Sequence, residues 1–230
     1  MNFNISRYHF NTESLLDDLD PEHFEKLAAS MQQIEKKKGE IIFKKGESSK
    51  GVYILKKGKV KIFQMNQDSR PQILYIYKSG ESFGYKPLLC KETHPVTAAT
   101  LEDSIISFIP KAPFFEVLKV SPQLSNRLLF NLSHEFTVWV NTTTAFAQQT
   151  VKERFALTLL ILNEKYKKAG SKKPVELNLS REDLSCYVGT ASESLIRIIR
   201  EFKEKKILEV KGRKIKIIDP KALMSLTEFY

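Results

Sequence analysis

The chain has 230 residues, of which 42% are hydrophobic, and a formal net charge of +10 at pH 7. This length accommodates one large domain or two smaller ones, and the apolar content is ordinary for a protein that buries a core. The longest apolar run, near residues 155–162, is too short to cross a bilayer, and no basic-then-apolar signal peptide opens the sequence. We therefore expect a soluble, cytoplasmic protein without a membrane partner.

The positive charge is concentrated toward the C-terminus, where residues 151–230 hold 18 Lys and Arg against 11 Asp and Glu. Such an excess favours a polyanionic partner, although a generally lysine-rich composition would give the same count. Cys90 and Cys186 lie far apart, so the sequence holds neither a disulfide framework nor a CxxC metal pair. We expect no metal site, no cofactor and a reducing compartment.

The N-terminal half is predicted to be helical at first and then β-rich. Residues 1–35 have a helical apolar spacing that opens at Pro21. From Lys36 onward, short apolar runs alternate with glycine turns, which predicts an antiparallel barrel or sandwich. The predicted strands are residues 40–43, 52–55, 60–63, 73–77, 96–98 and 105–109.

A long helix is predicted after Pro122, with a break near residues 149–150 before a second helix over residues 151–168. Its apolar residues follow an alternating spacing of three and four, which is the a/d seam of a coiled-coil dimer. A helix packed on its own barrel is the alternative. The predicted dimer seam consists of Leu129, Leu132, Phe136, Trp139, Thr143 and Phe146.

Residues 179–208 predict two helices joined by a turn at Gly189. Glu193 and Arg197 are four residues apart and share one face of the second helix, opposite an apolar face. Arg can donate to guanine O6 and N7, and Glu can accept from the cytosine amino group, so this face is suited to the DNA major groove. The apolar face consists of Leu195, Ile198, Ile199 and Phe202.

The same segment has a purely structural interpretation, because Thr190-x-x-Glu193 and Ser180-x-x-Asp183 are also capping boxes. A hairpin around Gly212 follows, and a helix-turn-helix with such a β-wing is a winged-helix DNA-binding domain. Small polar residues at the helix start and basic residues in the wing are expected to meet phosphate. The predicted DNA-binding residues are Arg181, Thr190, Ser192, Glu193, Ser194, Arg197, Lys211 and Arg213.

In this order the motifs resemble the CRP/FNR family of bacterial transcription regulators over essentially the whole chain. The resemblance is carried by FKKGESSKGVYILKKGKVKIF at 43–63, GESFG at 80–84, the helix opened by Ser121-Pro122, and LSREDLSCYVGTASESLIRIIREF at 179–202. It implies a homodimer whose N-terminal barrels sense an effector and whose winged helices bind a pseudo-palindromic operator. RNA polymerase would be a further partner if the regulator is an activator.

The expected fold is therefore α+β. An N-terminal antiparallel β-barrel of the cyclic-nucleotide-binding-like jelly-roll type (residues 1–120) is followed by a dimerisation helix (121–150) and a winged helix-turn-helix domain (151–230). An intracellular ligand sensor that acts through protein–protein contact is the alternative function. An enzyme is not expected, because the sequence lacks a nucleophile–base pair, a metal set and a P-loop.

The residues expected to bind an effector differ from those of the cyclic-AMP receptor, a member of the family that the chain resembles. In that receptor a Glu holds the ribose and an Arg holds the cyclic phosphate, whereas Tyr85 and Val96 stand at those positions here. Losing the Arg removes a bidentate, charge-assisted contact, so cyclic AMP is not expected to bind. Either an unknown small molecule binds, or the pocket is closed. The predicted pocket residues are Gly84, Tyr85, Lys86, Val96, Thr97, Trp139 and Val140.

Overall fold

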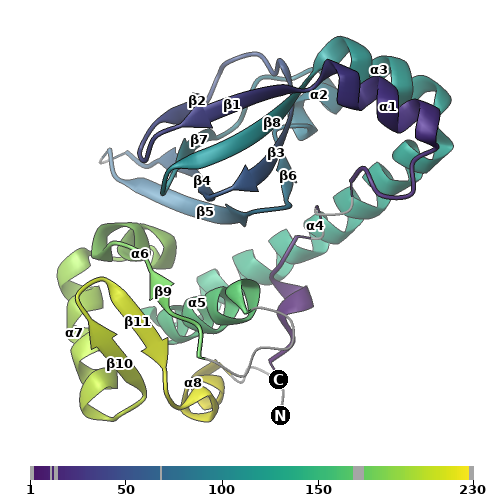
Figure 1. Ribbon diagram of the computed structural model, residues 1–230. Helices are drawn as coiled ribbons and strands as arrows, with labels where there is room; N and C mark the ends of the chain where they lie inside the picture. Colours follow the sequence, from purple (N-terminus) through teal and green to yellow (C-terminus); the bar gives the residue numbers. More distant parts are fainter. Residues whose placement is uncertain (1–2, 11, 13–14, 68, 168–173, 228–230) are drawn as a thin grey trace. The chain divides into compact units, whose positions relative to one another are not determined.

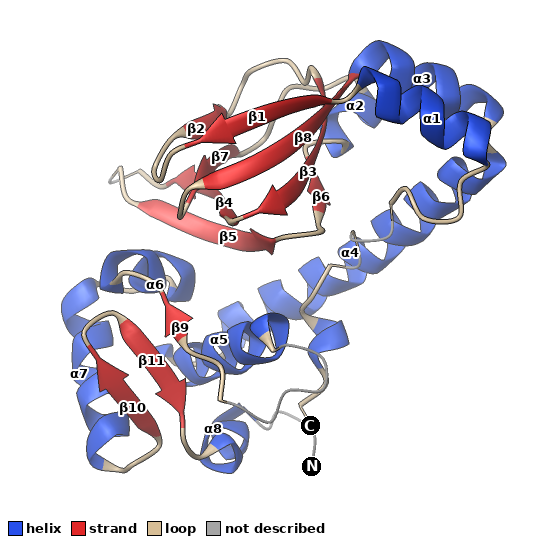
Figure 2. Cartoon of the chain, in the orientation of Figure 1, coloured by secondary structure: helices blue, strands red, loops and turns tan. Residues whose placement is uncertain are grey.

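The computed structural model describes residues 3–10, 12, 15–67, 69–167 and 174–227 (Figures 1 and 2). The chain forms two compact units, which we describe separately. The barrel unit contains Phe10–Ser69 and Leu74–Phe136, and the C-terminal unit contains Met1–His9, Arg70–Ile73 and Thr137–Tyr230. The domain boundaries expected at residues 120 and 150 stay a prediction.

Two four-stranded sheets form the barrel, with strand orders β1-β8-β3-β6 and β2-β7-β4-β5. The pairings described are antiparallel, for example β3 with β8 and β4 with β7. Alternation puts one face of each strand inside, as in β4, where Val60 and Ile62 are buried. The strands are β1 (Gln32–Lys36), β2 (Ile41–Phe43), β3 (Gly51–Lys57), β4 (Lys59–Met65), β5 (Pro71–Lys78), β6 (Ser82–Phe83), β7 (Thr97–Thr100) and β8 (Ser104–Pro110).

Helices α1 (Pro21–Ser30), α2 (Lys86–Cys90) and α3 (Lys111–Val120) and the first half of α4 (Pro122–Gln148) pack beside the sheets. One apolar cluster joins these elements, with Leu27 of α1, Phe114 of α3 and Leu128 of α4. The helix start at Pro21 is confirmed, but the helical prediction through residue 35 is wrong, because residues 32–36 pair with β8. Helices α2 and α3 and strand β6 were not predicted.

The predicted break between the two long helices is confirmed. Helix α4 ends at Gln148 and α5 (Val151–Tyr166) begins after Thr150, whose side chain and that of Glu153 form a capping box. The sequence also predicts a loop at residues 170–174, Gly-Ser-Lys-Lys-Pro, most of which lies outside the described residues. The described helices contain none that is both long and apolar enough to span a membrane.

The rest of the C-terminal unit is a helix pair followed by a small sheet of order β10-β11-β9. Its elements are β9 (Leu177–Asn178), α6 (Arg181–Val188), α7 (Ser192–Glu204), β10 (Leu208–Lys211), β11 (Lys214–Ile217) and α8 (Pro220–Thr227). The helix pair and the hairpin confirm the winged helix-turn-helix, whereas β9 and α8 were not predicted. Phe155 of α5 stacks on Phe202 of α7, with ring centroids 5.8 Å apart, so α5 carries the helix pair on a shared core.

Candidate nucleic-acid interface

Helix α6, which precedes the turn into α7, is fixed by hydrogen bonds at both ends. Ser180 caps α6, and its hydroxyl accepts a hydrogen bond of 2.9 Å from the Asp183 N–H. At the other end Gly189 takes φ +71°, a left-handed conformation that glycine adopts without strain. The carbonyl of Ser185 then accepts hydrogen bonds from the N–H groups of Gly189 and Thr190, at 2.9 and 3.0 Å.

Of the two capping boxes suggested by the sequence, only the one at Ser180 forms the cap of its helix. The N-cap of α7 is Ala191, which has no side-chain cap, so Thr190 lies outside the helix. Glu193 is therefore not held by a box with Thr190 and lies exposed in the first turn of α7. This removes the structural interpretation of Glu193 as a capping residue.

Helix α7 separates an apolar from a polar face. Leu195 and Phe202 are fully buried and Ile199 is 6% exposed, whereas Ile198 of the predicted apolar face is only half-buried. The opposite face exposes Glu193 and Arg197, as predicted. The Arg197 guanidinium donates to the hydroxyl of Ser194, at 3.3 Å. A guanidinium held by one hydroxyl on an exposed face keeps donors for a base or a phosphate.

Two further residues on this face were missed by the sequence analysis. Ile196 is 43% exposed and Arg200 is exposed, and both follow Glu193 at helical spacing. The same spacing argument that selected Arg197 would have found them. An exposed isoleucine can contact the thymine methyl group, and Arg200 adds a second guanidinium to the face.

The remaining predicted DNA-binding residues take different roles in the structure. The Ser192 and Ser185 hydroxyls are 3.0 Å apart, so Ser192 links α7 to α6. Arg181 donates to the Gly212 carbonyl in the wing turn at 2.7 Å, and burial lowers the pKa of its guanidinium. In the wing, Lys211 pairs with Glu209 at 3.2 Å, and Arg213 is exposed. The structure thus brings these residues together on the helix pair and wing, and their DNA contacts stay predictions.

Two of the predicted effector residues, Tyr85 and Lys86, are bonded to another side chain of the barrel unit. Tyr85 is 1% exposed, and its hydroxyl donates to the carboxylate of Glu135 on α4. The Lys86 ammonium pairs with the same carboxylate and lies 4.8 Å from the centre of the Phe10 ring. Burial, followed by the negative charge of Glu135, raises the pKa of the Tyr85 phenol well above its ordinary value.

Glu135 was not predicted, yet it is the residue around which this cluster forms. Its side chain is 2% exposed, which is costly for a carboxylate unless it is paired and hydrogen-bonded. Gly84 next to Tyr85 has φ +80°, and an added Cβ would meet the ring of Tyr53 at 2.6 Å. The Thr97 hydroxyl accepts a hydrogen bond from the Lys45 N–H at 3.1 Å.

The remaining predicted effector residues are Val96, Trp139 and Val140. Val96 is half-buried before β7, and Trp139 and Val140 belong to the part of α4 in the C-terminal unit. Val140 is 48% exposed. The role of Glu135 could not be predicted from the sequence, because a contact between residues 50 positions apart leaves no periodic pattern.

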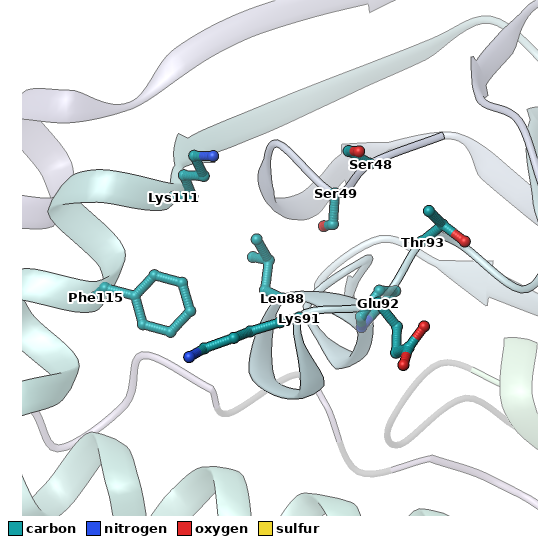
Figure 3. A pocket seen from close by; sticks show the side chains of 9 residues that line it. Ser48, Ser49, Leu88, Lys91, Glu92, Thr93, Lys111 and Phe115 are labelled. Atoms are coloured by element: carbon teal, nitrogen blue, oxygen red, sulfur yellow. The ribbon is translucent and has the colours of Figure 1, made fainter. Parts of the chain in front are cut away.

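A separate hollow of about 300 Å³ lies in the barrel unit (Figure 3). It contains two lysines, one glutamate and several hydroxyl groups, and none of the predicted effector residues. Its size is at the lower limit of small-molecule pockets. The residues that line it are Ser48, Ser49, Pro87, Leu88, Lys91, Glu92, Thr93, Lys111 and Phe115.

The predicted seam on α4 is unevenly exposed. Phe136 and Leu129 are 71% and 64% exposed, while Leu132, Trp139 and Phe146 are half-buried and Thr143 is exposed. Phe130 beside the seam is 58% exposed. Large apolar side chains grouped along one helix are typical of a protein interaction surface.

Comparison with known proteins defines the class of both units. Residues 33–121 match the family model of the cyclic nucleotide-binding domain, and residues 153–226 match that of the Crp-like helix-turn-helix domain. The fold and the exposed face of α7 thus define a transcription regulator with a DNA-binding helix-turn-helix. The chain belongs to the CRP/FNR family.

Two relatives and one solved structure illustrate the similarity. The chain is 28% identical to the transcriptional activator protein Anr of Pseudomonas protegens over 191 residues, which are 83% of this chain and 78% of that protein. It is 27% identical to the fumarate and nitrate reduction regulatory protein of Vibrio cholerae, covering 93% and 83% of the two chains. The structure of FixK2 from Bradyrhizobium japonicum superposes with a TM-score of 0.78 at 21% identity, covering 87% and 98%. The family consists of transcription regulators, not enzymes, and DNA is the partner that it implies.

Proposed function

We propose that the protein is a homodimeric regulator that reads a pseudo-palindromic operator with the exposed face of α7. The proposal rests on the Glu193–Arg197 pair, which is exposed on a helix whose opposite face is buried. A twofold dimer presents two such helices, and these match half-sites about one helical turn apart. The protein would act in the cytoplasm and would contact RNA polymerase if it is an activator.

The exposed apolar residues of α4 support the dimer. A seam that contains Leu129 and Phe136 would remove two large apolar side chains from water. In a dimer the two helix-turn-helix units act on one DNA molecule, so the second contact becomes intramolecular and raises the affinity.

The barrel is proposed to work without a cyclic nucleotide at Tyr85. Tyr85 and Lys86 are already bound to Glu135, and a nucleotide would have to displace this pairing without the Arg that its phosphate needs. If another effector exists, the hollow beside α2 in Figure 3 is the better candidate for its site. A thermal-shift titration with cyclic AMP and cyclic GMP tests this point. We expect no saturable rise in melting temperature. A ligand that binds the folded protein at a hundredfold excess over its Kd would instead raise the free energy of unfolding by about 2.7 kcal/mol.

Selection of binding sites from random DNA tests the function itself. We expect an enriched inverted repeat, bound by two chains, with an affinity that falls steeply as salt rises because counterions are released. A ligand sensor that acts through protein–protein contact would enrich no sequence. The matched control is a variant that carries Glu193→Ala and Arg197→Ala together, which should keep its fold and lose the enrichment.

A further inference from the structure

Arg154, in the first turn of α5, joins the ends of two other helices. Its guanidinium donates to the carbonyls of Val188 and Gly189 at 3.0 and 3.1 Å, at the C-terminal end of α6. It also donates to the carbonyls of Phe146 and Gln149 at 3.4 and 3.1 Å, at the C-terminal end of α4. All of these residues belong to the C-terminal unit.

These carbonyls are the acceptors that a helix cannot satisfy within itself, because the last turn lacks N–H partners. A cation at a helix C-terminus also interacts favourably with the helix dipole. Arginine serves two ends at once because its planar fork carries five donors, which lysine does not have. The Phe146 ring, 5.8 Å from the guanidinium carbon, holds the group from a further side.

The connection continues from the turn into the reading helix. The carbonyl of Ser185 accepts from Gly189 and Thr190, and the Ser185 hydroxyl contacts that of Ser192, the first residue of α7. A chain of hydrogen bonds therefore runs from the end of α4 through Arg154 and the turn to the start of α7.

We propose that Arg154 is a positioning residue that sets the half-site spacing accepted by the dimer. It does so by fixing the start of α7 relative to the end of α4, the helix that carries the seam. The inference rests on the proposed homodimeric function. One inserted base pair turns a half-site by about a tenth of a helical turn, so a fixed α7 discriminates strongly between spacings.

The experiment compares full-length wild type, Arg154→Met and Lys152→Met. Lys152 is the matched control, because its ammonium donates from α5 to Glu201 of α7, a contact that does not involve α4. Each protein is titrated against the selected operator, an isolated half-site, and operators with one base pair inserted or deleted between half-sites.

For Arg154→Met we expect half-site affinity within about twofold of wild type, since α7 keeps its reading face. Operator affinity should fall about tenfold, because α7 is no longer held where it meets the second half-site, and binding there becomes weaker. The preference for the natural spacing over the altered spacings should shrink by a similar factor. Lys152→Met should keep the wild-type preference.

An unchanged spacing preference in Arg154→Met overturns the inference while leaving the proposed function intact. Equal losses on half-site and operator also overturn it, since they indicate a folding defect. Arg154→Lys keeps the charge without the fork and should show most of the loss in spacing preference. Full rescue by lysine contradicts the role given to the fork, and a wild-type chain that binds DNA as a monomer refutes the proposed function together with the inference.

Discussion

The exposed polar face of α7 and the cluster around Glu135 use similar side chains for opposite purposes. On α7 a carboxylate and a guanidinium lie exposed, four residues apart, at Glu193 and Arg197. In the barrel unit a carboxylate is 2% exposed and is bound by the hydroxyl of Tyr85 and the ammonium of Lys86. Charged groups kept in water are available to an external partner, whereas charged groups paired in the interior hold the protein's own elements together.

This contrast explains why the structure supports the proposed DNA-binding face of α7 but does not support cyclic-nucleotide binding at Tyr85. On α7, the exposed Glu193 and Arg197 offer the acceptor and the donors that base recognition uses. In the barrel, Tyr85 and Lys86, which the resemblance predicts to lie at the ligand site, contact Glu135 of α4. A similar fold alone is therefore no evidence that the same ligand binds.

The largest effect is expected at the seam, which must hold two reading faces on one operator. Phe136→Asp would place a charge without a partner in the dimer interface, so the chain should become monomeric. Operator affinity should then fall by about a hundredfold or more as the second contact is lost. Light scattering and DNA titration measure both effects. Thr144→Asp, exposed on the same helix but off the seam, is the control, and a dimeric Phe136→Asp would place the interface elsewhere.

The next effect concerns the barrel side of the comparison. Lys86→Met leaves the buried carboxylate of Glu135 with the Tyr85 hydroxyl but without its ammonium partner, and it should lower the free energy of unfolding by about 2 kcal/mol. This value is below that of a fully buried pair because Lys86 is 35% exposed. Denaturant titration against Lys91→Met, an exposed lysine nearby, measures the difference. Equal stabilities of the two variants would mean that the pairing at Glu135 does not stabilise the barrel.

The phenol of Tyr85 gives the cluster a pH signature. Its pKa is raised above the ordinary 10.0 by burial and by Glu135, so the folded chain keeps a proton that the unfolded chain loses above that pH. This contribution is complete below pH 10 and should decline by about 1.4 kcal/mol per pH unit above it. Tyr85→Phe should show a shallower decline than wild type between pH 10 and 11 in denaturant titrations. Parallel curves would contradict the burial of the phenol.

The smallest effect is expected in the wing, where phosphate contacts carry no sequence information. Arg213→Ala should weaken specific and random DNA by the same factor. The salt slope of log K should become shallower by about 1, as for one lost phosphate contact. A change in base preference instead would move Arg213 from phosphate contact to base reading.

The reading helix could be predicted from the sequence because its signals are local. Glu193, Arg197 and the buried Leu195 and Phe202 are all fixed by the helical period. The position of Thr190 could not be predicted in this way, because the helix begins two residues later, with Ala191 at its N-cap position. Boundaries depend on turn geometry, which the left-handed Gly189 decides here.

The barrel cluster could not be predicted, because its partners come from distant parts of the chain. Glu135 lies within a helical pattern that says nothing about Tyr85, which is 50 residues away. The same holds for β1, whose residues 32–36 become a strand only by pairing with residues 104–108 of β8. Tertiary contacts determine both features, and single-sequence periodicity does not contain them.

The most direct test of the account is a competition assay with Arg197→Ala over every single-base variant of the operator. We predict a loss of about 1–3 kcal/mol on the selected site and a loss of preference at one base pair, a guanine that the guanidinium reads. Lys203→Ala, exposed near the end of the same helix, should leave the base preference unchanged. If Arg197→Ala lowers the affinity for all variants equally and keeps the preference, the exposed face of α7 does not read bases through Arg197, and the central claim is wrong.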